Sequence, residues 1–205
     1  MKRVVEPEIL DSLEVIDPQA VRSRRDLRLV NWFMRGEAWV LRQLAILNPN
    51  KVVELGAGEG CLVNAIKERF PNAQVTGVDL VNRPNSIKSE VQWHAANVFE
   101  YEEFDTDTVV VANLFVHHLQ DEELYRLAER LSGVRAILFA EPYRGGVPLL
   151  MGRCIFPVIN EVTRHDMIVS IKAGFREREL SEFFGEGYEC SEERGLFGGI
   201  RFKAI

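Results

Sequence analysis

Residues 51–60 read KVVELGAGEG, and residues 77–80 read GVDL. Val52, Val53 and Leu55 form the short apolar run that is typical of a strand buried on both faces of a sheet. The three glycines that follow allow a tight turn and a close approach of the backbone to a ligand. Asp79 ends the next predicted strand, where a carboxylate can accept hydrogen bonds from both hydroxyls of a ribose. The two segments therefore predict a β-α-β unit that binds a nucleoside.

Two other interpretations of the glycine turn have to be weighed. One is a strand-to-helix turn that binds no ligand, which the co-occurrence of the turn with Asp79 disfavours. The other is a dinucleotide site, whose G-x-G-x-x-G pattern requires a third glycine where this chain has Cys61. Glu54, two residues before Gly56, would repel a pyrophosphate and attract a cation. The pattern thus favours a cationic, adenosine-containing cofactor.

This constellation resembles class I S-adenosylmethionine-dependent methyltransferases over roughly residues 50–205. The resemblance implies an α/β, Rossmann-like, seven-stranded sheet with an antiparallel last strand, S-adenosylmethionine across the strand tips, and S-adenosylhomocysteine (SAH) as product. It implies that Glu54 lies near the methionine part and that Asp79 holds the ribose. Asn97 stands where the family often has Asp, and its amide oxygen can still accept a hydrogen bond from adenine. The residues that the resemblance implies for cofactor binding are Glu54, Gly56, Ala57, Gly58, Gly60, Asp79, Leu80, Asn97, Val98 and Asn113.

The composition is that of one globular domain. The chain has 205 residues, of which 46% are apolar and 27% charged, enough for a single core. A net charge of −6 argues against nucleic acid as the main partner. The scattered cysteines at 61, 154 and 190 include no C-x-x-C pair, so we expect reduced thiols and no metal site. The start lacks a signal-peptide pattern and no apolar run approaches about 20 residues, which predicts a cytoplasmic enzyme without membrane insertion.

The first 48 residues are expected to form a helical extension ahead of a cofactor-binding domain at 49–205. Residues 1–18 are acidic and interrupted by prolines, which predicts a mobile arm or a short docking helix. Residues 19–47 carry an apolar stripe at helical spacing, with a possible break at Gly36. This segment also contains six arginines. They form either a solvated face that pairs with acids or part of a lid over the strand tips. In the lid interpretation, an apolar pocket is walled by Trp32, Phe33 or Trp39.

Further strands are predicted near 74–79, 91–95, 108–113 and 135–142. The last two, at 187–194 and 198–205, are expected to form a hairpin connected through Leu196 and Phe197. A helix should begin with Asp121 as its N-cap and end at Gly133. The antiparallel C-terminal pair is what the methyltransferase resemblance implies and a dinucleotide fold does not.

Proton transfer from an acceptor hydroxyl requires a base, and imidazole titrates near neutrality. The candidates are His118, in the VHH segment after the fourth strand, and His165, between the fifth and sixth strands. The alternative interpretation of the histidine pair at 117–118 is that it supports the loop and does not act as a base. For His165, a Thr163–Asp166 capping box is the competing interpretation. Glu141, at the end of the fifth strand, is either a base or a structural residue.

The expected acceptor is small and apolar. Apolar side chains surround the candidate bases in sequence: Phe115, Tyr143, Leu149, Leu150, Met151, Phe156 and Met167. Segments 23–34 and 160–184 are also similar to a bacterial methyltransferase subgroup associated with type III polyketide synthases. That similarity implies O-methylation of a phenol, pyrone or quinol. The rival hypotheses are an S-adenosylmethionine-binding protein without catalysis and, less favoured, a nicotinamide-dependent oxidoreductase.

Overall fold

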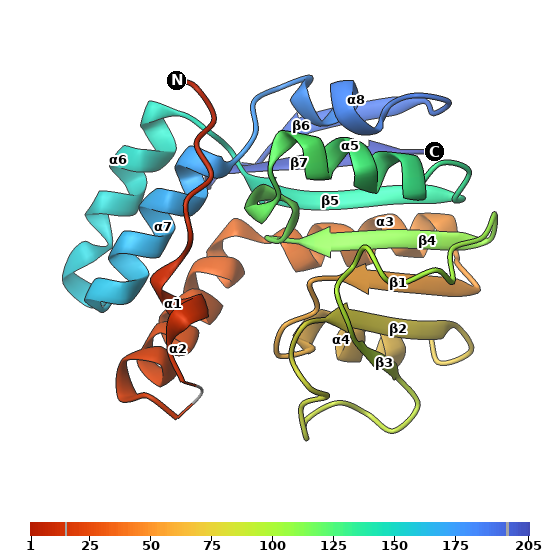
Figure 1. Ribbon diagram of the computed structural model, residues 1–205, viewed down its shortest axis with the longest axis horizontal. Helices are drawn as coiled ribbons and strands as arrows, with labels where there is room; N and C mark the ends of the chain where they lie inside the picture. The colour runs from red at the N-terminus through yellow and green to blue at the C-terminus, as the bar shows by residue number, and fades with distance from the viewer. Residues whose placement is uncertain (15, 196) are drawn as a thin grey trace.

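The computed structural model describes residues 1–14, 16–195 and 197–205. The described strands form one seven-stranded sheet in the order β3-β2-β1-β4-β5-β7-β6 (Figure 1). Strands β1 to β5 run parallel, whereas β7 pairs antiparallel with both β5 and β6. The strands are β1 (Lys51–Leu55), β2 (Gln74–Asp79), β3 (Gln92–Ala95), β4 (Thr108–Asn113), β5 (Ala136–Pro142), β6 (Cys190–Arg194) and β7 (Gly199–Ala204). The predicted seven-stranded sheet with a reversed last strand is confirmed.

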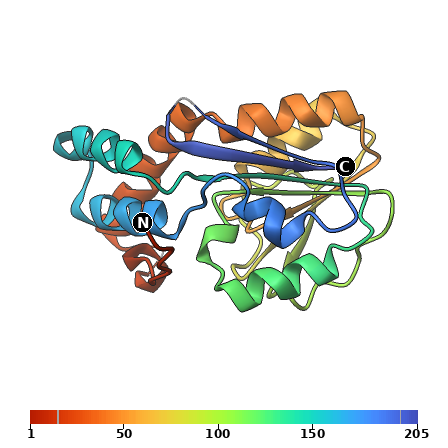
Figure 2. The same ribbon diagram turned by 90° about the horizontal axis from the view of Figure 1, so that it is seen from above.

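Helices cover both faces of this sheet. Figure 2 shows α3 and α4 on one face and α5 and α8 on the other, each packed through a separate apolar cluster. Helices α1, α2, α6 and α7 gather beyond the carboxyl ends of the parallel strands (Figure 1). The helices are α1 (Ile9–Ser12), α2 (Pro18–Met34), α3 (Gly36–Leu47), α4 (Cys61–Arg69), α5 (Asp121–Arg130), α6 (Gly146–Cys154), α7 (Glu161–Ala173) and α8 (Glu179–Phe184), with short 3-10 turns η1 (Val116–His118) and η2 (Phe156–Val158). Within the described parts of the chain, no helix is both long and apolar enough to cross a membrane.

The central strands are apolar on both sides because both faces of the sheet are covered. In β1, Val53 and Leu55 pack towards α5 and α8, while Val52 packs towards α3 and α4. All three side chains are fully buried, and each contributes about 1.5–3 kcal/mol of apolar burial. The continuous apolar run in the sequence thus follows from a strand with two buried faces.

The helical extension is split where the sequence predicted a break. Arg35 adopts a left-handed conformation with φ of 58° and separates α2 from α3. Gly36, which begins α3, lies against the end of β4, where a Cβ atom would be 2.3 Å from Oδ1 of Asn113. Only glycine allows this approach of the helix to the sheet.

The N-terminal arm contains the short docking helix that was one of the two expectations. Helix α1 packs against α7, and Asp166 of α7 accepts hydrogen bonds from the backbone N–H groups of Ile9 (2.8 Å) and Leu10 (3.0 Å). Upstream, the N–H of Val4 donates to the carbonyl of Lys172 at 3.3 Å. The arm is therefore fixed to α7 at two points.

Three local expectations need correction or qualification. The N-cap of α5 is Gln120, which forms a capping box with Glu123, so Asp121 is the first helical residue and not the cap. The N-cap of α7 is Asn160, whose side chain accepts the N–H of Thr163, so the Thr163–Asp166 capping box, which was the competing interpretation for His165, is wrong. The predicted hairpin of the last two strands is confirmed, but the expected connection includes Leu196, which lies outside the described residues.

Candidate functional site

The glycine turn after β1 is folded against the end of β2. The N–H groups of Gly56 and Ala57 donate to the carbonyl of Val78 at 2.9 and 3.2 Å. All three glycines of the turn have positive φ angles, of 68°, 53° and 76° at Gly56, Gly58 and Gly60. A Cβ atom on Gly56 would lie 2.1 Å from the ring of Phe115. The turn thus needs glycine both for its conformation and for its contact with the segment after β4.

Asp79 joins this turn through its side chain. One carboxylate oxygen accepts the N–H of Gly58 at 2.7 Å, and the other accepts the N–H of Val81 at 3.0 Å. A carboxylate offers about four lone-pair positions, so the two backbone hydrogen bonds leave capacity for further donors. Asp79 is partly exposed, and it can still accept hydrogen bonds from a ribose.

Glu54 is a buried carboxylate next to the same turn. Its side chain is 3% exposed, and Oε2 has no hydrogen-bond partner among the described residues. Burial raises the pKa of Glu54 well above its usual range, and the charges of Glu37 and Asp79 raise it further. A hydrogen bond from the backbone of Val63 lowers the pKa but does not offset these effects. Such a group is stabilised in its ionised form only when a cation or several donors reach it.

The other residues predicted for the cofactor lie along one edge of the sheet. Since β3, β2, β1 and β4 are parallel neighbours, Asn97, Asp79, Gly56 and Asn113 all follow the carboxyl ends of adjacent strands. Asn97 is exposed, and its side-chain oxygen caps the N–H of Phe99 at 3.0 Å. Three further residues were predicted to contact the cofactor. Ala57 and Val98 are buried, and Leu80 is exposed.

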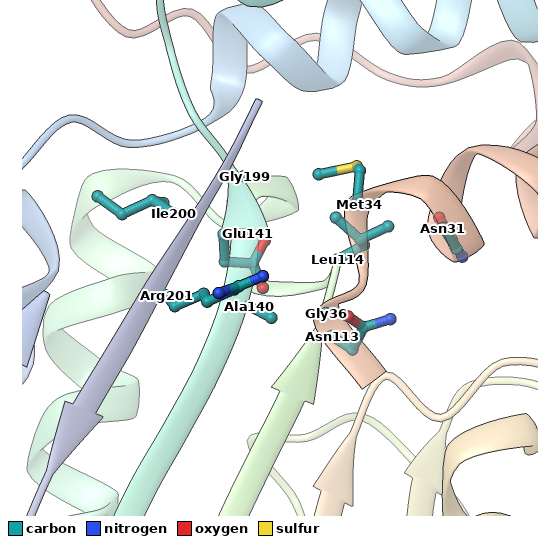
Figure 3. A pocket seen from close by; sticks show the side chains of 10 residues that line it. All are labelled: Asn31, Met34, Gly36, Asn113, Leu114, Ala140, Glu141, Gly199, Ile200 and Arg201. Carbon is teal, nitrogen blue, oxygen red and sulfur yellow. The ribbon is translucent and has the colours of Figure 1, made fainter. Parts of the chain in front are cut away.

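A small pocket lies beside Asn113, between the ends of β4, β5 and β7 and the junction of α2 with α3 (Figure 3). Leu114 on its wall has a left-handed φ of 58°, a strained conformation for a branched residue, and its N–H donates to the carbonyl of Ala140 at 2.8 Å. Oδ1 of Asn31 is buried without a partner in the described chain. The pocket is lined by Asn31, Met34, Gly36, Asn113, Leu114, Ala140, Glu141, Gly199, Ile200 and Arg201.

Glu141 fixes the segment that follows β4. Its carboxylate accepts the N–H groups of Phe115 and Val116, each at 3.0 Å, and that of His117 at 3.3 Å. Nδ1 of His117 lies 2.7 Å from the second carboxylate oxygen. Burial lowers the pKa of His117, but the hydrogen bond to Glu141 and the nearby carboxylate of Glu8 outweigh it and raise the pKa to about 9. Glu141 therefore has the structural role that was one of its two interpretations.

The two candidate bases are both held by carboxylates. Nε2 of His118 lies 3.2 Å from Oε1 of Glu8 in the arm, and the ring is about one-third exposed. Nδ1 of His165 lies 3.0 Å from Oδ1 of Asp166, and its side chain is 48% exposed. Asp166 thus orients His165 while it also caps α1.

The arginine-rich helix α2 is paired with the glycine turn. Arg28 and Arg24 lie 2.9 and 3.8 Å from the carboxylate of Glu59, the residue between Gly58 and Gly60. The arginines therefore pair with an acid, as one of the two interpretations expected, and the pairs place α2 beside the glycine turn. Trp39, in contrast, is 3% exposed and packs in the core cluster below α3 and α4.

The predicted apolar wall is divided among three places. Phe115 and Tyr143 pack against the main core, and Leu149, Phe156 and Met167 belong to a separate cluster between α6 and α7, while Leu150 and Met151 are exposed. Sequence reasoning missed a contact between Phe33 of α2 and Phe197, whose ring centroids lie 6.4 Å apart. It also missed Glu8, because nothing near Glu8 in the sequence indicates that it meets residues more than 100 positions away.

No protein-family model matches the chain. Solved structures with the same fold include the plantazolicin methyltransferase BpumL in complex with SAH and a monoazolic desmethylPZN analog, at 12% identity and a TM-score of 0.73, covering 92% of this chain and 90% of that one. A putative O-methyltransferase from Nostoc punctiforme has 15% identity and a TM-score of 0.66, covering 96% and 64%. Human N-acetylserotonin methyltransferase in complex with SAM has 14% identity and a TM-score of 0.64, covering 95% and 60%. At these identities the likeness concerns architecture, and the chain has the class I methyltransferase fold.

Proposed function

We propose that this protein is an S-adenosylmethionine-dependent methyltransferase that methylates a small apolar or aromatic acceptor. The observation that carries the proposal is Glu54, a buried carboxylate with an unpartnered oxygen beside the glycine turn. The ammonium group of S-adenosylmethionine supplies the missing cation, whereas the pyrophosphate of a nicotinamide cofactor would be repelled. The same geometry therefore favours the methyl donor over the dinucleotide.

Different residues of the chain bind different parts of the cofactor. Glu54 binds the amino-acid part, the backbone of the turn at Gly56 and Gly58 supports the middle, and Asp79 accepts hydrogen bonds from the ribose while retaining those from the backbone. Asn97 and Asn113 stand at the outer ends of this row of strand tips. The bound donor supplies an activated methyl group, and the protein has to align the acceptor with it and exclude water.

Residues 1–48 act in this proposal as a lid on the cofactor-binding domain at 49–205. The ion pairs between α2 and Glu59 support this role, because they attach the lid to the turn itself. Both arginines are partly exposed, so each pair contributes at most about 1 kcal/mol. These two pairs consequently oppose a movement of α2 away from the turn only weakly, whereas α3 is held in the core by its buried side chains.

The acceptor is proposed to be the hydroxyl of a phenol, pyrone or quinol. Support comes from exposed aromatic side chains near the end of α2: Trp32 and Phe33 contact edge to face at 5.0 Å, and Phe33 meets Phe197. Trp32 is 71% exposed, which is unusual for so large an apolar ring unless a ligand or partner covers it. His165 and His118 are the proposed bases, and Asp166 holds Nδ1 of His165 so that Nε2 can accept the proton.

Calorimetric titration with SAH and with NAD tests the cofactor. Binding of SAH in the micromolar range without binding of NAD is expected, and the reverse would reject the proposal. Incubation with S-adenosylmethionine and a panel of alkylated phenols and pyrones, followed by mass spectrometry, tests the acceptor. Binding of SAH without methyl transfer to any of these compounds would favour the non-catalytic alternative.

A further inference from the structure

Three side chains from distant parts of the chain converge outside the cofactor site. Glu8 comes from the N-terminal arm, and His117 and His118 come from η1. Oε1 of Glu8 lies 3.8 Å from Nε2 of His117 and 3.2 Å from Nε2 of His118. One ligand atom from each residue lies within 4.8 Å of the others. Two imidazole nitrogens and one carboxylate oxygen thus face a common point.

These nitrogens lie near the carboxylate of Glu8 but form no hydrogen bond with it. In the described chain, Nε2 of neither histidine has a partner with hydrogen-bond geometry. The side chain of His117 is 3% exposed and that of Glu8 is 10% exposed. A buried polar atom that is aimed at other ligand atoms without a partner costs free energy, and a bound group would remove that cost.

The surrounding contacts hold the three ligand atoms in place. Glu141 lies 2.7 Å from Nδ1 of His117, which places one proton at Nδ1 and directs Nε2 at Glu8. A metal ion would replace the proton that Nε2 carries when the imidazole is charged. A carboxylate behind a ligating histidine is the usual outer partner in zinc sites. The arm is fixed on both sides of Glu8, by Val4 and by the Asp166 cap of α1, and Ser170 donates to Oε1 of Glu8.

We propose that Glu8, His117 and His118 bind one divalent transition-metal ion of the zinc type. Zinc accepts imidazole nitrogen and carboxylate oxygen at about 2.0–2.2 Å, so its tetrahedral ligands are about 3.4 Å apart. The observed separations of 3.2 and 3.8 Å require only small side-chain movements to reach this value. Hard cations such as Mg²⁺ prefer an all-oxygen set and are disfavoured here.

The ion fastens the arm to the segment after β4. Three protein ligands leave the fourth position of a tetrahedral site for water. The negative charges of Glu8 and Glu141 favour a cation at this point. None of the three residues is proposed to bind the methyl donor, so metal binding is independent of SAH binding. An ion on Nε2 of His118 would exclude that residue as the base and leave His165 in this role.

Metal binding is tested with the full-length protein after removal of metals by a chelator. Calorimetric titration with Zn²⁺ should give one equivalent per chain, and Co²⁺ should give the visible absorption of a four-coordinate site. Glu8→Gln and His118→Gln should each lower the Zn²⁺ affinity about tenfold or more, since loss of even an outer partner costs 10–100-fold. His94→Gln is the control, because it removes a histidine that packs against Tyr101 in another part of the fold.

Mg²⁺ should give no saturable binding in the same titration. Circular dichroism of each variant establishes that it is folded. The proposal is overturned if the wild type binds no Zn²⁺ at one equivalent, or if Glu8→Gln and His118→Gln bind it as tightly as the wild type. Zero stoichiometry with intact SAH binding would show that the three residues form only an imidazolium–carboxylate contact, and would leave the methyltransferase proposal standing.

Discussion

Replacement of Glu54 by Gln should change stability and cofactor binding in opposite directions. In the absence of ligand, Glu54 is a buried carboxylate with one unpartnered oxygen, and its pKa is raised well above the usual range by burial and by the charge of Glu37. A raised acid pKa in the folded state means that the contribution to stability is complete below the unfolded pKa of about 4.3 and is lost as pH rises through the folded pKa. At neutral pH and above, the carboxylate therefore opposes folding.

The expected changes in unfolding free energy and in SAH affinity follow from the unpartnered oxygen of Glu54 and from the cation that it lacks. Removing the charge relieves a penalty of about 1–3 kcal/mol for an unsatisfied buried group, but the new amide brings N–H donors that also need partners, so we expect a net stabilisation of about 1 kcal/mol. Loss of the contact between carboxylate and ammonium should weaken SAH binding by roughly 1.5–3 kcal/mol, about 10- to 150-fold in Kd.

Both quantities can be measured on the same preparation. Urea unfolding at pH 5 and pH 8 gives the free energy of unfolding, and calorimetric titration gives the Kd for SAH. Glu68→Gln is the matched control, because it removes the same charge from an exposed position on α4 where Glu68 pairs with Lys88. An unchanged Kd in Glu54→Gln, or a protein that is destabilised at pH 8, would refute the assignment of Glu54 as the ligand of a cation.

Three further predictions concern other parts of the fold. Asp79→Ala should weaken SAH binding by roughly 1.5–3 kcal/mol in calorimetry while leaving urea unfolding nearly unchanged, because the N–H groups that it releases are exposed to solvent. Gly36→Ala should destabilise the protein by about 1–3 kcal/mol in urea unfolding, since the new Cβ would lie 2.3 Å from Oδ1 of Asn113. Hydrogen bonds from Lys51 and Thr108 lower the pKa of Asp105 to about 2. The stabilisation of the fold by ionised Asp105 is therefore present above about pH 4 and is lost as pH falls through about 2. Asp105→Asn should reduce this loss of stability in acid by less than about 1 kcal/mol, because Asp105 is half exposed in its ion pair with Lys51.

The core of the fold was predictable because its signals are local. A buried parallel strand is a continuous apolar run, and β2 and β4 agree with their predicted bounds, while β1 contains the predicted run at 52–55. The turn between β1 and α4 contains glycines at the positions that have positive φ angles. The break at Gly36 was visible for the same reason, although Asn113, which requires glycine there, is distant in the sequence.

Helix caps and the helical extension were less predictable. Asp121 and Gln120 are both polar residues before an apolar stripe, and only backbone geometry shows which one precedes the first helical turn. The role of the arginines in α2 depends on where α2 docks, and that docking brings Arg28 to Glu59 across 31 positions. Sequence alone gave the basic patch but not its partner.

The two sites proposed here share one physical principle. Glu54 and Glu8 are both largely buried carboxylates whose environment favours a nearby positive charge, but they differ in what accompanies them. Glu54 has an unpartnered oxygen beside a backbone turn that suits a large organic ligand, whereas Glu8 faces two imidazole nitrogens. Among the described residues, a set of three close ligand atoms that suits a metal ion occurs at Glu8 and not at Glu54. The chemistry of the neighbouring groups, and not the burial of the carboxylate, therefore determines which cation each site selects.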